Sequence, residues 1–167
     1  VYLMLNNIPN ANEIPREKPQ DKQWTRSLIN ALNSDDEKQV IHTALMIMEQ
    51  AFQNRLEFNP ALNDALFILL ENGMQKQLAS MTIAATWALV WVIEQFRKQQ
   101  TNWQPSTQQQ ELLSRLLNSP NSDQYAVICT LHIVNEIESS LNIEDYMQQW
   151  ARECARIADQ PSDHDKV

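Results

Sequence analysis

Residues 28–49 read LINALNSDDEKQVIHTALMIME, and this stretch decides the fold. Its leucine-rich start ends at Asn33-Ser34-Asp35-Asp36, whose side chains hydrogen-bond to nearby backbone and interrupt a helix. Ser34 and Glu37 make a capping-box pair for a second helix. Beyond them, apolar residues recur at the spacing of one buried helix face: Val40, Ile41, Ala44, Leu45, Met48, Ala51 and Phe52. The stretch therefore predicts two helices joined by a short polar turn.

The same arrangement recurs along the chain. Thr43, Thr86 and Thr130 lie in three apolar helical stretches, 43 and 44 residues apart. Residues 112–136, LLSRLLNSPNSDQYAVICTLHIVNE, again place a leucine-rich segment, an Asn-Ser turn and an amphipathic segment in that order. A period of roughly 40 to 47 residues with two helices per unit is typical of stacked helical hairpins.

Caps, breakers and periodicity together predict seven helices. Asn59 and Pro60 are typical of a helix start, and Gly73 is typical of a helix end. The expected helices cover residues 24–32, 36–52, 60–72, 76–98, 105–117, 123–139 and 143–158. In the last of them the apolar face holds Ile143, Tyr146, Met147, Trp150, Ala151 and Cys154.

The stretches 28–49 and 112–136 resemble the HEAT and armadillo class of α-solenoids. The resemblance implies an all-α, right-handed α-solenoid of about three antiparallel helical hairpins plus a C-terminal capping helix. Residues 1–22, with three prolines, are expected to be an extended arm or linker; residues 23–159 the helical-repeat domain; and residues 160–167 a disordered tail. A helical bundle without repeats is the alternative fold.

Composition narrows the function. Gly73 is the single glycine among 167 residues, which disfavours a β-rich fold built on tight turns and excludes a glycine-rich phosphate loop. The formal net charge of −8 makes nucleic acid an unfavourable partner. Cys129 and Cys154 form no closely spaced pair, which favours reduced thiols and a cytoplasmic location. The chain begins at Val1 without an initiator methionine, so we expect a fragment of a larger protein.

One apolar segment, Leu78 to Ile93, is a candidate membrane span. It is shorter than the ~20 residues that a bilayer requires, and it carries Ser80, Thr82 and Thr86. We therefore expect a buried helix and no membrane partner.

A shift of 43 residues superposes the three second helices and predicts a binding groove. Three rows of residues then share one ridge: Thr43, Thr86 and Cys129; Met46, Leu89 and His132; Gln50, Ile93 and Glu136. In solenoids the second helices line the concave face, so these rows are expected to cross the groove. The predicted partner-binding residues are Met46, Leu89, Ile93, Phe96, Cys129, His132 and Glu136. In the alternative interpretation neighbouring hairpins, the arm or a parent domain cover the central helix.

The sequence gives little support for catalysis or metal binding. Cys129, His132 and Glu136 share a helix face and are all zinc-ligand types, but no fourth ligand stands at a motif spacing. No catalytic residue, metal site or cofactor is expected. Asp35, Asp36 and Glu37 are explained by a helix N-terminus, where carboxylates are favourable.

The sequence thus favours a non-catalytic interaction or scaffold module that binds a basic or helical protein segment along the groove. Self-association of the chain is a second way to cover the central apolar helix. Two alternative functions stay open: a regulatory or sensory segment of a larger enzyme, and a small metal-dependent enzyme.

Overall fold

The computed structural model describes residues 22–99 and 102–137, together with the single positions 144, 148, 151, 152, 155, 158 and 159. The two continuous ranges form six helices and contain no strand, which confirms the predicted all-α class. The helices are α2 (Lys22–Leu32), α3 (Glu37–Phe52), α4 (Pro60–Gln75), α5 (Ala79–Gln99), α6 (Thr107–Asn118) and α7 (Gln124–Glu136).

Local capping explains where four of these helices begin. Asn59 accepts from the Ala61 amide and is followed by Pro60, as predicted. Asp123 accepts from the amides of Tyr125 and Ala126 at the start of α7. At α6, Ser106 and Gln109 form a reciprocal capping box. These side chains satisfy amides that have no partner within the helix.

The predicted capping box of Ser34 and Glu37 is wrong. Asp36 is the N-cap of α3 and accepts from the amides of Lys38 and Gln39. The Ser34 hydroxyl instead accepts from the Asp36 amide and donates to Gln39 Oε1. An aspartate two residues nearer to the helix outcompetes Ser34 because its charge also suits the helix N-terminus.

The sequence predicted that Gly73 ends its helix, and this is wrong. Helix α4 continues past Gly73 to Gln75. The left-handed residue of this turn is Gln77, with φ of 55°. Gly73 is needed for space: a Cβ there would lie 2.8 Å from Thr82 Oγ1 and 3.0 Å from the Thr82 backbone nitrogen. The glycine therefore lets α4 and the start of α5 approach closely.

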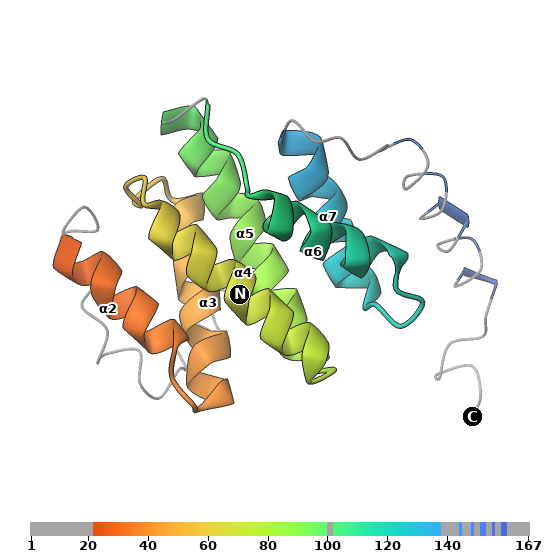
Figure 1. Ribbon diagram of the computed structural model, residues 1–167, viewed down its shortest axis with the longest axis horizontal. Coiled ribbons are helices and arrows are strands. Elements are labelled where there is room, and N and C mark those ends of the chain that lie inside the picture. The colour runs from red at the N-terminus through yellow and green to blue at the C-terminus, as the bar shows by residue number, and fades with distance from the viewer. Residues whose placement is uncertain are drawn as a thin grey trace.

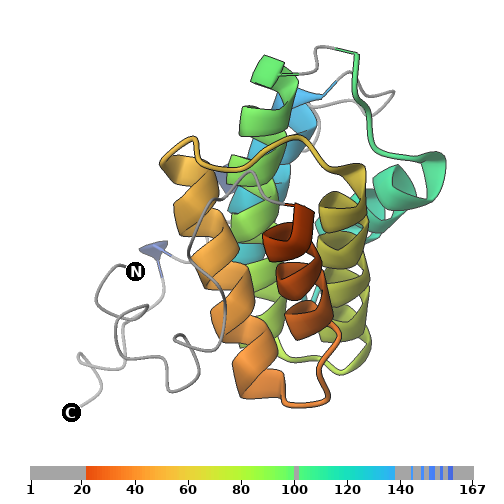
Figure 2. The same ribbon diagram turned by 90° about the vertical axis from the view of Figure 1, so that its left-hand side faces the viewer.

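The helices are arranged in two layers (Figures 1 and 2). Helices α3, α5 and α7 lie side by side in one layer, and α2, α4 and α6 lie in the other. Each helix of the first layer also packs on the helix that precedes it in the chain. Helix α5 contacts α3, α4 and α7 and is therefore the centre of the molecule.

The second half of α5 lies deep in the core. Leu89, Val92, Ile93 and Phe96 have no exposed surface. Helix α5 is also long and apolar enough to cross a membrane by length and composition, although most of it is buried among the other helices. The expectation that the apolar segment is a buried helix fits this packing.

Two glutamine contacts join segments far apart in the sequence. The backbone carbonyl of Leu56 accepts from Gln95 Nε2 and Gln99 Nε2, each at 2.7 Å, which fixes the α3–α4 connection to the end of α5. Gln109 Oε1 accepts from the Ser106 amide, while its Nε2 donates to Asp64 Oδ1 of α4 at 2.7 Å. Gln109 thus caps α6 and holds it to α4.

The burial pattern gives the register of the repeat. A shift of 45 residues superposes buried positions of α3, α5 and α7: Val40, Ala85 and Thr130; Ala44, Leu89 and Val134; Ile47, Val92 and Ile137. The same shift superposes more exposed positions: Lys38, Ile83 and Ile128; His42, Trp87 and His132. A shift of 43 differs by two residues, which rotates a helix by about 200°. The 43-residue register therefore placed Leu89 and Ile93 of α5, which are completely buried, on the groove face.

Three predicted segments fall largely outside the described residues. They are the arm at 1–22, of which only Lys22 is described and belongs to α2, the tail at 160–167, and most of the helix at 143–158. Of that helix, positions 144, 148, 151, 152, 155 and 158 are helical and exposed. Ala151 was expected on its buried face and is exposed, so that expectation is wrong.

Candidate functional site

Four of the seven predicted partner-binding residues belong to the core. Met46 is 4% exposed, and Leu89, Ile93 and Phe96 are completely buried. Their placement in an open groove was wrong. The side of α5 that carries Leu89, Ile93 and Phe96 packs on other helices, and Met46 of α3 is buried as well. Cys129 is half-buried, and His132 and Glu136 are exposed, so these three lie on accessible surface.

The accessible side of α5 carries a different apolar stripe. Ile83, Trp87, Val90 and Trp91 are partly buried, whereas the rest of the apolar residues on this helix beyond Ala79 are buried. Their spacing of three and four residues places them on one helix face. We call these four residues the tryptophan ridge. The ridge was missed by the sequence analysis, although the spacing of Ile83, Trp87 and Trp91 was visible there.

Phe52 at the end of α3 extends this surface. Its side chain is 62% exposed, and its ring meets Trp91 edge to face, with centroids 5.0 Å apart and planes at 87°. Aromatic pairs favour this geometry because the positive edge of one ring meets the negative face of the other. Phe52 was expected on the buried face of its helix; its position beside Trp91 gives it a partner without removing it from solvent.

Carboxylates lie one helical turn from this aromatic pair. Glu49 precedes Phe52 by three residues and Glu94 follows Trp91 by three, and both are half-buried. Glu49 accepts from Gln53 Nε2 at 3.3 Å, and Glu94 forms an ion pair with Lys98 at 3.4 Å. The surface beside the tryptophan ridge thus combines apolar rings with negative charge.

Histidines flank the ridge on the neighbouring helices. In the 45-residue register, His42 of α3 and His132 of α7 occupy the positions equivalent to Trp87. Burial is the main cause that lowers the pKa of His42, followed by repulsion from Lys38, while Asp36 partly opposes both. Loss of the proton keeps His42 uncharged at neutral pH, which suits an apolar surface.

Cys129 lies at the junction of α7 and α5. Burial raises the pKa of its thiol, a hydrogen bond with Thr86 acts in the opposite direction, and Asp123 raises the pKa further. A thiol with a raised pKa is a poor nucleophile at neutral pH. Among the described residues, no group of three or more His, Cys, Asp or Glu side chains is arranged to hold a metal ion. Cys129, His132 and Glu136 do not form such a group with one another or with another described side chain.

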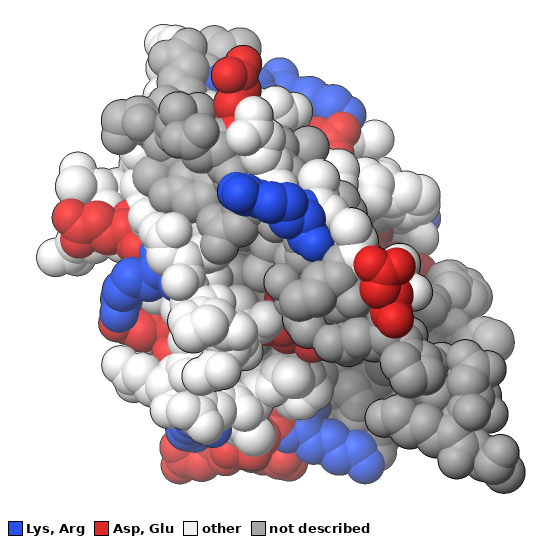
Figure 3. All heavy atoms as spheres, turned by 90° about the vertical axis from the view of Figure 1, so that its right-hand side faces the viewer, with Lys and Arg blue, Asp and Glu red and all other residues white. Residues whose placement is uncertain are grey.

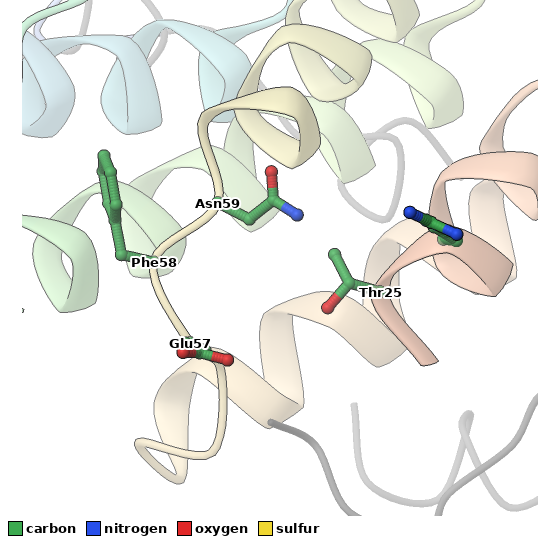
Figure 4. Close-up of a pocket in the computed structure, with 5 residues that line it drawn as sticks. Thr25, Glu57, Phe58 and Asn59 are labelled. Atoms are coloured by element: carbon green, nitrogen blue, oxygen red, sulfur yellow. The ribbon is translucent and has the colours of Figure 1, made fainter. Parts of the chain in front are cut away.

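Two hollows lie away from the ridge. One, of about 210 Å³, lies between α2 and the α3–α4 connection and is lined by Thr25, Arg26, Glu57, Phe58 and Asn59 (Figure 4). The other, of about 430 Å³, lies between the α4–α5 and α6–α7 turns, with Thr82, Ser122 and Asp123 in its wall. The side chains of Asp123 and Asn59 cap their helices, while Thr25, Arg26 and Glu57 also line the first hollow.

Charge is dispersed at the α6–α7 end of the molecule. Over the described part of the face in Figure 3, acidic and basic side chains alternate without a large patch of one sign. Glu71 and Arg115 form an ion pair at 3.7 Å that joins α4 to α6. This end therefore shows no basic stripe of the kind that binds nucleic acid.

The tryptophan ridge with Phe52 and its adjacent carboxylates is the candidate site, since it is the accessible apolar surface at the centre of the layer formed by α3, α5 and α7. Known proteins add no assignment to it: no family model, no curated protein and no solved structure matches this chain.

Proposed function

We propose that this chain is a non-catalytic protein-interaction module that binds a partner segment across the tryptophan ridge. In this proposal the two layers are a right-handed α-solenoid of the HEAT and armadillo kind, in which α2–α3, α4–α5 and α6–α7 are antiparallel hairpins. A cytoplasmic location and a fourth, C-terminal capping element complete the proposal.

One observation carries it. Two tryptophans one turn apart, with Ile83 and Val90 beside them, are only partly buried on the most central helix of the molecule. Tryptophan offers a large apolar area and is enriched at the centres of protein interfaces. A contiguous apolar surface of this kind usually marks a binding site.

The partner is an amphipathic helical segment with basic residues. Apolar side chains at i, i+4 and i+7 of such a helix match a ridge whose own residues stand three and four apart. The net charge of −8 favours encounter with a basic segment.

A selection from a displayed library of helical peptides tests the proposal. The wild-type chain should enrich peptides that bind it, and Trp87→Asp should lose them while its circular dichroism stays that of a folded helical protein. Ile68→Asp is the matched control, because Ile68 is 55% exposed on α4, in the other layer, and should not affect binding. Ile83→Asp gives a second test at the ridge. Peptides that bind Trp87→Asp and Ile83→Asp as tightly as wild type would show that the ridge is not the site.

A further inference from the structure

The geometry points to a docking corner for an arginine side chain of the partner, formed by Phe52, Trp91, Glu49 and Glu94. This inference rests on the proposed function and specifies the chemistry of the partner at one end of the tryptophan ridge. We call these four residues the arginine corner.

The aromatic walls of the corner come from two helices. The rings of Phe52 and Trp91 stand at 87° with centroids 5.0 Å apart, and Phe52 keeps 62% of its surface exposed. A cation placed against the exposed surface of such a pair is attracted by the negative faces of the rings, and tryptophan gives the strongest attraction. Two walls at nearly a right angle also restrict where the cation can lie.

The charge of the corner comes from the same two helices. Residues three apart are neighbours on a helix surface, so Glu49 lies beside Phe52 and Glu94 beside Trp91. Glu49 binds the Gln53 amide and Glu94 binds Lys98, contacts that leave each carboxylate able to accept further hydrogen bonds. One carboxylate beside each ring suits a guest with several donors.

Arginine fits this combination better than lysine. Its planar guanidinium stacks on an indole and offers five N–H donors in fixed directions, whereas the lysine ammonium is compact and strongly hydrated. The nearby Arg97 does not fill the role, because its Nη1 donates to the Trp103 carbonyl at 3.0 Å. Lys98, the cation that contacts Glu94, is expected to compete with the guest.

The first test is a titration of the full chain with N-acetyl-arginine amide, observed through the tryptophan indole N–H signals in NMR spectra. N-acetyl-lysine amide and N-acetyl-glutamine amide are the comparison probes. We expect millimolar binding of the arginine probe, a shift of the Trp91 signal, weaker binding of the lysine probe and none of the glutamine probe. Equal shifts with the glutamine probe, or no shift of Trp91 with arginine, would overturn the inference.

Variants give the second test. Glu49→Gln and Glu94→Gln should each weaken the arginine probe about two- to fivefold, the range of exposed ion pairs. Lys98→Gln should strengthen it, because Glu94 loses its competing partner. Glu71→Gln and Tyr125→Leu are matched controls: Glu71 lies on α4, and Tyr125 is a 60% exposed aromatic residue on α7. Controls that weaken the probe as much as the corner variants would contradict the assignment.

Phe52→Leu keeps the test valid if substitution of Trp91 unfolds the protein, since Phe52 is mostly exposed. It should abolish the shift caused by the arginine probe. The peptide selection separates the two proposals. Selected peptides that bind the ridge but contain no arginine, and ignore Glu49→Gln and Glu94→Gln, would refute the corner and leave the ridge intact. Binding of the arginine probe without any selected peptide would support the corner and refute the larger docking surface.

Discussion

Gly73 of α4 lies so close to Thr82 of α5 that no side chain fits between them. An added Cβ would be 2.8 Å from Thr82 Oγ1, 3.0 Å from the Thr82 nitrogen and 3.2 Å from Met81 Cγ. The Thr82 hydroxyl cannot easily turn away, because it donates to the Leu78 carbonyl at 3.1 Å. This contact sets the distance between the two central helices.

Gly73→Ala is therefore expected to destabilise the protein. Alanine gains about 1 kcal/mol over glycine inside a helix, but overpacking of a tight contact costs about 1–3 kcal/mol. Urea unfolding followed by circular dichroism measures the difference, with Asn72→Ala at a neighbouring exposed position as control. A Gly73→Ala protein more stable than wild type would mean that the helices separate without cost.

Leu89 and Trp87 provide a direct test of the 45-residue register. Leu89 is completely buried, so Leu89→Ala should lower the free energy of unfolding by about 2–5 kcal/mol. Trp87→Ala removes a larger side chain but a half-exposed one, and should cost less. Chemical denaturation of both variants gives the comparison. The reverse order would favour the 43-residue register, in which Leu89 faces a groove.

The two glutamines at the Leu56 carbonyl should differ in tolerance to charge. Gln95 is 3% exposed and Gln99 is exposed, although both donate to the same oxygen at 2.7 Å. Gln95→Glu puts a carboxylate beside a buried carbonyl and should cost roughly 3 kcal/mol. Gln99→Glu can turn into water and should cost clearly less. Similar unfolding midpoints for the two variants would show that the α3–α4 connection does not depend on the buried amide.

Protonation of His42 should make a small contribution to the pH dependence of stability. Because the folded state lowers the pKa of His42 below its ordinary value of 6.5, the unfolded chain binds the proton more readily. The contribution to stability is fully present above pH 6.5 and is lost as the pH falls through the lower folded pKa. His42→Gln should therefore reduce the loss of stability on acidification, measured by urea unfolding at pH values on both sides of 6.5. Lys38→Met, which removes the second cause of the shift, should reduce it less.

The sequence was a good guide to local structure. The Asn59 and Pro60 helix start and the spacing of apolar residues in α3 depend on neighbours within one or two turns, and such signals are complete in the chain itself. The predictions for Ser34 and Gly73 failed because each residue type is compatible with two different local roles. Serine can cap or support a cap, and glycine can end a helix or allow close packing.

The candidate site was harder to predict because it depends on relative rotation. The 43-residue spacing of Thr43 and Thr86 was real, but the two threonines are not equivalent in the 45-residue register, which pairs Thr43 with Ala88 and Thr86 with Ile41. A two-residue error in the repeat register hardly changes where a helix is located. It rotates the helix by about 200°, however, and so changes which residues are expected to face water. Trp87 and Trp91 were recognised as part of an apolar helix, yet only the contacts of α5 with three other helices leave their side open.

Gln109 carries a consequence for how the molecule comes apart. The side-chain oxygen of Gln109 accepts from the Ser106 amide at the start of α6, and its side-chain nitrogen donates to Asp64 of α4. The first turn of α6 thus reaches its lowest free energy only after α4 has docked. Unfolding that begins in one pair of helices must then weaken the neighbouring pair, so thermal denaturation of the described helices is expected to be concerted and not stepwise.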